Sequence, residues 1–252
     1  MFRSYCLAMY MSRPRTASSP SAAAQRRLPE GLALALPSGL ALTLAVGVLA
    51  LDQGSGALLA GGAYLAAGGL VTVAMLRHYP HDRLGACNAV TLMRMALTLA
   101  LLAPLVGVGA AGWIVAGIAT LSLTLDGVDG YLARRSGLCS AFGARFDMEV
   151  DAGLALILAL HAYVGSPVGA EVLILGVMRY VFITLGWIWP WMTAPLPVSY
   201  LRKTVCVLQL ATLIALQLPQ MPPDLAIWLT RLVSAALIWS FGRDMLWLWR
   251  TR

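Results

Sequence analysis

The sequence has little charge and no sustained polar region in which a soluble domain could fold. Only 12% of the 252 residues are charged, whereas 60% are hydrophobic. A soluble globular domain carries about 25% charged residues. Apolar runs long enough to cross about 30 Å of hydrocarbon recur along nearly the whole chain. The composition therefore excludes a soluble core and predicts a membrane protein with several spans.

Thiol and imidazole chemistry is also poorly represented. The four cysteines show neither a CxxC pair nor the spacing of a zinc site, and the three histidines are scattered. The topology derived below puts the cysteines on or near the cytoplasmic side, where thiols stay reduced. We interpret the cysteines as inert and the histidines as ordinary solvated or interfacial residues.

Basic residues outnumber acidic ones, and the formal net charge is +7. They are spread along the chain as in membrane proteins and do not form one basic patch, so we expect no nucleic-acid partner. Residues 1–30 contain five arginines and no apolar signal-peptide core, and we expect a disordered cytoplasmic tail there. This Arg- and Ser-rich start is also weakly similar to a transit peptide.

Eight apolar segments follow the tail, and their lengths predict an all-α integral membrane protein of about eight spans. An even number of spans puts both termini on the same side of the membrane. The predicted segments are 31–51, 56–76, 88–107, 111–130, 146–164, 168–189, 203–219 and 224–243.

The distribution of Lys and Arg gives these segments one orientation. Neither residue occurs in four of the connections, which are 52–55, 107–110, 165–167 and 220–223. Fifteen of the eighteen basic residues lie in five other regions, which the positive-inside rule assigns to the cytoplasm. Those regions are the tail, 77–87, 134–145, the 202–203 junction and the stretch after Phe241. We therefore expect a multi-pass protein of a bacterial cytoplasmic membrane with both termini in the cytoplasm.

The first two segments, within 31–76, consist almost wholly of Ala, Gly, Leu and Val. Small residues are spaced for close helix approach at Ala57 and Gly61, and again at Gly62 and Ala66. We interpret these segments as two accessory transmembrane helices that precede a six-helix core in residues 77–252. The alternative is that a small-residue face forms a homodimer contact.

Acidic residues are rare, yet five of the eleven fall between Asp126 and Asp151. Asp126 and Asp129 share one helix face, and so do Asp147 and Asp151, because residues three or four positions apart lie on the same side of a helix. The short loop between the two helices makes them antiparallel neighbours, so the four carboxylates should converge. Converging carboxylates need cations between them. Oxygen ligands favour two Mg²⁺ or Mn²⁺ ions, which can grip a diphosphate.

Residues near the four aspartates fit a phosphate site. Gly130 and Gly143 each lie one turn from an aspartate, where a bare backbone lets a phosphate approach closely. Arg134 and Arg135 follow, and an arginine can clamp phosphate oxygens, although positive-inside anchoring alone would explain one of them. Glu149 lies on another side of its helix, and we interpret it as solvated or salt-bridged.

The spacing D-x2-D-G-x2-A-R-x8-G-x3-D-x3-D in this stretch resembles the signature of the CDP-alcohol phosphotransferases. All eight positions match, and they are Asp126, Asp129, Gly130, Ala133, Arg134, Gly143, Asp147 and Asp151. The resemblance covers about residues 85–245, the predicted six-helix core, and leaves the first two segments outside.

The resemblance implies that a CDP-linked lipid, such as CDP-diacylglycerol, gives its phosphatidyl group to an alcohol and releases CMP. Asp151 would touch metal and would also take the proton of the attacking hydroxyl. Three further aspartates would hold the two metal ions, namely Asp126, Asp129 and Asp147. Four residues would shape the cytidine and diphosphate pocket, namely Gly130, Ala133, Arg134 and Gly143.

Polar residues in other segments give less specific predictions. Asn88, Thr91 and Arg94 share one face of the third segment and resemble the family's first core helix, where such residues approach the nucleotide; helix capping by Asn88 is the alternative. Three basic residues in later segments would bind the acceptor, with structural pairing or membrane anchoring as the alternative, and they are Arg179, Arg202 and Lys203.

The acceptor alcohol stays open. Phosphatidylglycerophosphate synthases commonly have proline after the third aspartate and lysine after the last, where this sequence has Met148 and Ala152. An ion-coupled transporter is the alternative function, because intramembrane acids also mark ion pathways. The enzyme is favoured because the acids cluster at one interface.

Overall fold

The structure is a computed structural model that describes residues 28–52, 54–107, 112–136, 140–194, 196–197 and 199–251. Of residues 129–136 it describes the backbone but not the side chains. Within these ranges every regular element is helical, and the single strand-like feature is a bridge between Glu30 and Arg83. The predicted all-α class is confirmed.

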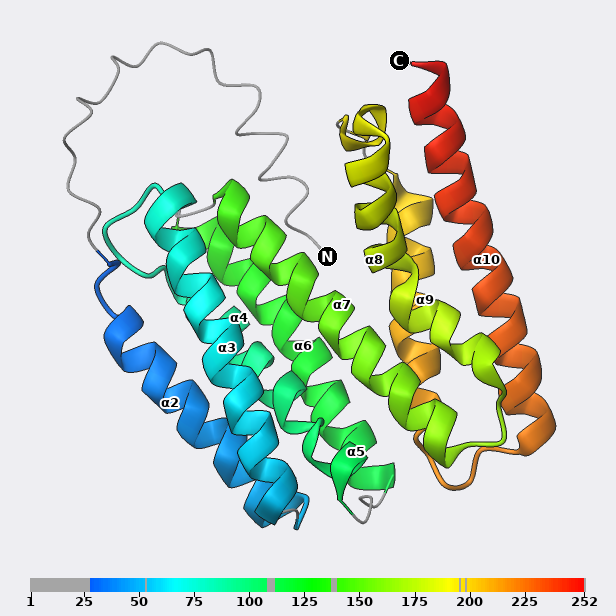
Figure 1. Ribbon diagram of the computed structural model, residues 1–252, viewed down its shortest axis with the longest axis horizontal. Helices are drawn as coiled ribbons and strands as arrows, with labels where there is room; N and C mark the ends of the chain where they lie inside the picture. Colours follow the sequence, from blue (N-terminus) through cyan, green and yellow to red (C-terminus); the bar gives the residue numbers. More distant parts are fainter. Residues whose placement is uncertain are drawn as a thin grey trace. The chain divides into compact units, whose positions relative to one another are not determined.

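The helices follow the predicted segments closely and are labelled in Figure 1. They are α2 (Leu32–Ala45) with its π-helical continuation η1 (Val46–Ala50), α3 (Gly54–His78), α4 (Ala86–Ala100), α5 (Ala103–Val106), α6 (Gly112–Ser136), α7 (Ala141–Gly165), η2 (Ala170–Val172), α8 (Leu173–Ile188), η3 (Pro190–Thr193), α9 (Tyr200–Ala215) and α10 (Pro223–Arg250).

Six stretches of the described residues are long and apolar enough to cross a membrane, so the protein is a multi-pass membrane protein. They are Leu32–Ala50, Gly54–His78, Ala86–Val106, Ala141–Gly165, Ala170–Ile188 and Pro223–Arg250. The other two predicted spans correspond to α6 and α9. In α6 the residues with described side chains, Gly112–Val128, form an apolar helical stretch, and α9 has 16 residues. Spans at these two helices stay a prediction.

The chain divides into two compact units. Unit 1 comprises Met1–Ala110 and Thr120–Val150, and unit 2 comprises Ala111–Ala119 and Asp151–Arg252. Both boundaries inside the helical region fall within single helices, α6 and α7. Residues on the two sides of such a boundary therefore still follow one continuous helix.

In unit 1 the two N-terminal helices pack against α4, because glycines and alanines let the backbones approach. Thr43 Oγ1 on α2 donates to the carbonyl oxygen of Ala96 on α4 at 3.2 Å. A Cβ at Gly56 on α3 would lie 2.2 Å from the carbonyl oxygen of Ala103 on α5. The predicted accessory helices thus form part of the same packed unit as the start of the predicted core.

The two small-residue pairs on α3 have different surroundings. Ala57 and Gly61 are buried inside unit 1, where Gly61 lies against Leu44 of α2. Gly62 and Ala66 are exposed. The first pair therefore serves packing within the chain, and the homodimer contact stays a prediction for the second.

One end of unit 1 brings together three regions that the charge pattern assigns to the cytoplasm. The backbone of Glu30 pairs with Asp82 and Leu84 of the α3–α4 connection at 2.7 and 2.9 Å. The ring of Tyr79, in the same connection, meets Phe142 at the start of α7 with 5.9 Å between centroids. The starts of α2 and α7 and the α3–α4 connection therefore lie at the same end of unit 1.

In unit 2, α10 packs along α9 and α8, and two glutamines of α9 and its C-terminal turn join neighbouring helices. Gln209 Nε2 donates to the carbonyl oxygen of Leu175 on α8. Gln217 Nε2 donates to the carbonyl oxygen of Leu158 on α7 at 3.1 Å. Hydrogen bonds of this kind satisfy polar side chains inside an apolar helix bundle.

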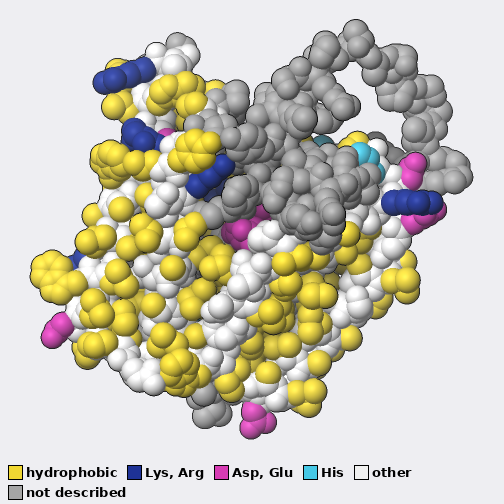
Figure 2. All heavy atoms as spheres, turned by 180° about the vertical axis from the view of Figure 1, so that it is seen from behind, with side chains coloured by type: hydrophobic (Ala, Val, Ile, Leu, Met, Phe, Trp, Pro, Cys, Tyr) yellow, Lys and Arg dark blue, Asp and Glu magenta, His cyan; other side chains and the backbone are white. Residues whose placement is uncertain are grey.

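The outward faces of the helices are apolar. Figure 2 shows hydrophobic side chains over most of the described surface in that view. Leu58 and Leu70 on α3 are each 73% exposed, and Trp228 on α10 is 70% exposed. Lipid tails are as apolar as these side chains, so a bilayer accepts them without cost.

Candidate active site

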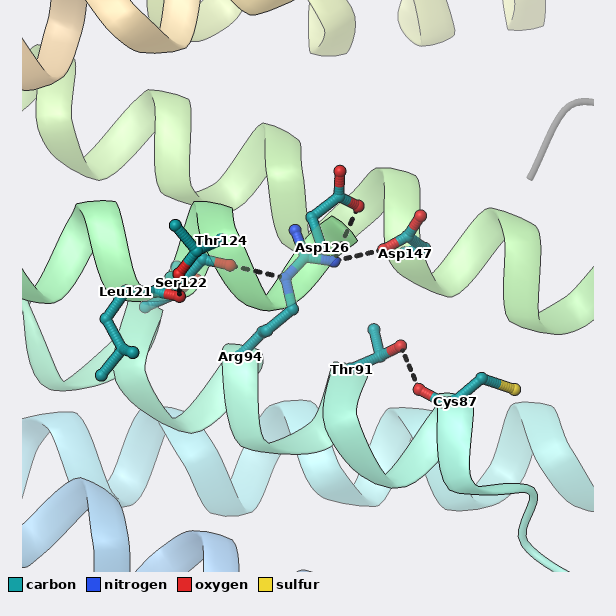
Figure 3. A network of polar contacts seen from close by, with 9 residues as sticks. Cys87, Thr91, Arg94, Leu121, Ser122, Thr124, Asp126 and Asp147 are labelled. Atoms are coloured by element: carbon teal, nitrogen blue, oxygen red, sulfur yellow. Dashed lines mark hydrogen bonds and ion pairs between the residues drawn. The ribbon is translucent and has the colours of Figure 1, made fainter. Parts of the chain in front are cut away.

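Arg94 lies at the centre of the candidate site, about two turns into α4. Its side chain has no exposed surface. Nη1 donates to Asp126 Oδ1 on α6 at 3.2 Å and also to Asp147 Oδ1 on α7. Nε donates to the carbonyl oxygen of Ser122 on α6 at 3.0 Å. Figure 3 shows the guanidinium joined to both carboxylates and to the backbone of α6, and this one cation thus ties three helices of unit 1 together.

Asp126 and Asp147 are themselves buried, with 8% and 2% of their surface exposed. Burying an ionised carboxylate costs several kcal/mol unless a partner of opposite charge is close. The guanidinium of Arg94 is that partner for both. The convergence of α6 and α7 that the acidic pairs predicted is confirmed for these two residues.

Asp151 completes a cluster of three carboxylates. It follows Asp147 by four residues on the continuous helix α7 and is half-buried. One carboxylate oxygen from each of Asp126, Asp147 and Asp151 lies within 4.8 Å of the other two. Oxygen donors that converge in this way suit a hard divalent cation such as Mg²⁺ or Mn²⁺. The described residues therefore fit the predicted metal ions.

Several predicted residues of the signature lie outside the described side chains, and their roles stay predictions; they are Asp129, Gly130, Ala133 and Arg134. Gly143 is described and is buried in the first turn of α7. Its N–H donates to Ser140 Oγ at 3.0 Å. Ser140 therefore caps α7 and fixes the start of the helix that carries Asp147 and Asp151.

Asn88 and Thr91 precede Arg94 on α4, and both are buried. Thr91 Oγ1 donates to the carbonyl oxygen of Cys87 at 2.9 Å. Asn88 does not cap α4, because the N-cap is Gly85. Its Nδ2 donates to the hydroxyl of Tyr79 at 3.0 Å, whereas its Oδ1 has no hydrogen-bond partner within the part of the chain that the structure describes. A buried acceptor of this kind can receive an N–H or O–H of a ligand.

Two of the basic residues predicted to bind the acceptor lie at the start of α9 in unit 2. Arg202 Nη1 pairs with Asp244 of α10 at 2.8 Å, and Nη2 donates to the carbonyl oxygen of Pro197 at 2.5 Å. The ammonium of Lys203 lies 5.5 Å from the centroid of the Tyr200 ring. Both side chains are half-buried.

Arg179 of α8 is the third basic residue predicted to bind the acceptor, and it belongs to unit 2 together with Arg202 and Asp151. The charges of Arg179, Arg202 and Asp151 all act electrostatically on the thiol of Cys206 on α9. In unit 2 the carboxylate predicted to act as a base thus shares its electrostatic surroundings with two of the cations predicted to bind the acceptor.

Asp244 is a buried carboxylate that the sequence analysis missed. It is 8% exposed and pairs with Arg202 at 2.8 Å and with Arg243 at 3.4 Å. Arg243 also donates at 3.0 Å to the hydroxyl of Ser199, which is the N-cap of α9. This network joins the start of α9 to the last turns of α10. The available signal was a single aspartate next to Arg243 in the stretch after Phe241.

Arg231, for which the sequence indicated no partner, also has one in the structure. Its Nε lies 3.4 Å from Glu171 Oε1 on η2. The pair is largely exposed, and exposed pairs add little stability. We therefore assign Arg231 no part in the site.

These features define a multi-pass, all-helical membrane protein with a buried cluster of aspartates. A family model for CDP-alcohol phosphatidyltransferases matches residues 85–241, which is more than half of the chain. The protein therefore belongs to the CDP-alcohol phosphatidyltransferase family. The match includes all three clustered aspartates and leaves α2 and α3 outside. A search of the curated proteins and a search of the solved structures each returned no match.

Proposed function

We propose that this protein transfers a phosphatidyl group from a CDP-linked lipid, such as CDP-diacylglycerol, to an alcohol and releases CMP. Its family supports the reaction class. The observation that carries the proposal is the convergence of Asp126, Asp147 and Asp151, because carboxylate oxygens at this spacing can hold the cations that a diphosphate donor requires.

The aspartates of α6 and α7 would hold two divalent cations, Mg²⁺ or Mn²⁺. Asp126 and Asp147 supply buried oxygens, Asp151 supplies a half-buried one, and Asp129 would complete the set. When bound, the cations neutralise the diphosphate and the negative charge that develops on departing CMP.

Asp151 is the proposed general base. A hydroxyl oxygen of the acceptor attacks the phosphorus of the phosphatidyl group, and the hydroxyl proton passes to an Asp151 carboxylate oxygen. The bond between that phosphorus and the bridging oxygen of the diphosphate breaks, and CMP leaves with the bridging oxygen. Asp151 suits this role better than Asp147 because it is less buried and can be reached by an incoming alcohol.

The nucleotide pocket would lie along the start of α4 and the stretch between α6 and α7. Asn88 Oδ1 offers a buried acceptor for a nucleotide N–H or O–H. Six further residues would line this pocket, and they are Thr91, Arg94, Gly130, Ala133, Arg134 and Gly143.

The acceptor would bind near Asp151 through the basic residues Arg179, Arg202 and Lys203. The shared electrostatic influence of Asp151, Arg179 and Arg202 on Cys206 supports this proposal. Asp244 would orient Arg202 by holding one side of its guanidinium. Cations at this place favour an acceptor that carries a negative charge.

Both termini and the site would face the cytoplasm of a bacterial cell, where soluble alcohols meet the CDP-linked lipid. The grouping of the predicted cytoplasmic regions at one end of unit 1 supports this orientation. The lipid bilayer is the expected surrounding, and the exposed Gly62 and Ala66 face is where a homodimer would form.

The test is an acceptor panel. Purified protein in lipid nanodiscs receives CDP-diacylglycerol, Mg²⁺ or Mn²⁺, and one alcohol at a time, with glycerol phosphate, inositol phosphate, serine and inositol among them. We expect metal-dependent release of CMP with one alcohol and loss of release when the metal is chelated.

Asp151→Asn is the matched control for the panel, because it removes the base and keeps the shape of the side chain. We expect it to lose CMP release by about 100-fold or more while it retains most nucleotide binding. No CMP release by the unmodified protein with any alcohol, together with no metal-dependent binding of CDP, would argue strongly against the proposed function.

A further inference from the structure

Arg94 already provides a positive charge at the place where a metal ion is expected. The guanidinium donates to an oxygen of Asp126 and to an oxygen of Asp147, two of the three carboxylates that converge. Its side chain is completely buried, so salt screens these contacts much less than it would at the surface. The geometry therefore raises the question of how this cation and a divalent cation share two carboxylates.

The position of Arg94 is held from a second direction. Nε donates to the backbone carbonyl oxygen of Ser122, one turn before Asp126 on the same helix. The planar guanidinium thus donates from Nε to a carbonyl oxygen and from Nη1 to two carboxylates, which its several N–H groups in one plane allow. The arrangement keeps two buried carboxylates close together without requiring a metal ion.

We propose that Arg94 is the internal counterion of Asp126 and Asp147 and that a divalent cation binds these carboxylates in competition with its guanidinium. This inference rests on the proposed function, since it concerns the metal ions of that site. Arg94 is then a positioning residue that preserves the spacing of the aspartates before metal arrives. The same contacts lower the affinity for metal, because a fixed positive charge opposes a second cation and its hydrogen bonds must be given up.

The competition has consequences that a purely structural ion pair does not have. A purely structural pair stabilises the fold. Its removal would leave the affinity for metal unchanged, or would lower that affinity by letting the ligands separate. An internal counterion does the reverse, so its removal destabilises the metal-free protein and raises the affinity for metal. The two roles therefore predict different changes in the affinity for metal when Arg94 is replaced: a rise for an internal counterion, and no rise for a structural pair.

The first experiment measures Mn²⁺ binding to the purified full-length protein in nanodiscs by electron paramagnetic resonance of free Mn²⁺, without substrate. We expect Arg94→Gln to bind Mn²⁺ about tenfold more tightly or better, because the competing charge is gone. Arg94→Lys retains the charge and should stay within about threefold of the unmodified protein. Equal or weaker Mn²⁺ binding by Arg94→Gln would overturn the proposal.

Arg231→Gln is the matched charge control, because it removes one arginine from an exposed ion pair with Glu171 that has no place in the site. It should bind Mn²⁺ as the unmodified protein does. A rise in affinity equal to that of Arg94→Gln would mean that net charge alone is responsible, and that outcome also contradicts the proposal.

A second measurement needs no change at Arg94 and remains informative if Arg94→Gln does not fold. In protein labelled with ¹⁵N-arginine, the Nε–H resonance of Arg94 is identified by its loss in Arg94→Lys. Addition of Mg²⁺ should shift that resonance and speed its exchange with solvent, because metal replaces the guanidinium at the carboxylates. An unchanged resonance at saturating Mg²⁺ would overturn the inference.

The inference and the proposed function fail in different ways. If the unmodified protein bound no divalent cation at millimolar concentration while Arg94→Gln also bound none, the metal-dependent function itself would be excluded. If both bound Mn²⁺ with the same affinity, the metal site would stand and only the role of Arg94 would be wrong.

Discussion

Tyr79 is the residue whose importance only the folded chain makes visible. Its hydroxyl donates to the carbonyl oxygen of Arg83 at 3.0 Å and accepts from Asn88 Nδ2 at 3.0 Å and from the N–H of Gly85 at 3.3 Å. One phenol thus fixes both the turn before α4 and the orientation of the Asn88 amide. That orientation leaves Asn88 Oδ1 as the atom able to receive a ligand donor.

Tyr79→Phe should therefore weaken nucleotide binding. The change leaves the ring in its contacts with Phe142 and removes the acceptor of Asn88 Nδ2. Once the Asn88 amide is no longer held, the hydrogen bond between Asn88 Oδ1 and the nucleotide is lost. Loss of that one bond costs about 0.5 to 1.5 kcal/mol, so the dissociation constant of CDP should rise about 2- to 12-fold. Calorimetric titration with CDP and Mg²⁺ measures it.

The control for this change is Tyr163→Phe, which alters an exposed tyrosine on the outer face of α7. It should leave CDP binding as it is. If Tyr79→Phe bound CDP as tightly as the unmodified protein, Asn88 would not be held for a ligand by the Tyr79 hydroxyl, and the role given to Tyr79 would be wrong.

At the scale of helices, the contact between α3 and α5 depends on the absence of a side chain at one position. A Cβ at Gly56 would lie 2.2 Å from the carbonyl oxygen and 2.9 Å from the carbonyl carbon of Ala103. Both atoms belong to the backbone, so the helices must separate to accept a methyl group. The α5 segment is the C-terminal continuation of the span that carries Arg94.

Gly56→Ala should therefore destabilise unit 1. Overpacking of this kind costs about 1 to 3 kcal/mol, and we expect a lower midpoint of thermal unfolding in detergent. Gly62→Ala is the matched control on the same helix, because a Cβ there meets nothing within 4 Å. It should leave the midpoint unchanged or raise it slightly, since alanine favours a helix. A midpoint unaffected by Gly56→Ala would show that α3 and α5 do not approach so closely.

At the scale of the whole molecule, the distribution of Lys and Arg predicts which regions lie at the same end of each unit, and the observed contacts agree with it. In unit 1, Glu30 joins Asp82 and Leu84 through the backbone. In unit 2, Arg202 at the start of α9 pairs with Asp244 near the end of α10. Each contact joins two of the regions that the positive-inside rule assigns to the cytoplasm.

Single cysteines test the orientation that follows. Asp82 and Asp52 are both exposed, and they lie at opposite ends of α3. In a protein whose four natural cysteines are replaced, Asp52→Cys should react with a membrane-impermeant maleimide added to intact cells. Asp82→Cys should react only after the membrane is permeabilised. Labelling of Asp82→Cys in intact cells would reverse the proposed topology.

Much of the fold and part of the site could be predicted from the sequence. The run 31–51 predicts the helical stretch observed at Leu32–Ala50, because the length and apolarity of a span are local properties. The spacings of Asp126, Asp147 and Asp151 predict the cluster of carboxylates, because helix periodicity puts these side chains on facing sides of two helices joined by a short loop.

Contacts between residues far apart in the chain were decided by the tertiary structure alone. Arg94 was expected at the nucleotide, and the packing of α4 against α6 and α7 brings its guanidinium to two aspartates 32 and 53 residues away. Asp244 gave no pattern because Arg202, the partner at 2.8 Å, lies on another helix, and a single carboxylate has no spacing to interpret. The sequence by itself determined the helices and the chemistry of the aspartates, since both follow from local periodicity. Only the packing of the helices decided that the guanidinium of Arg94 pairs with two of those aspartates.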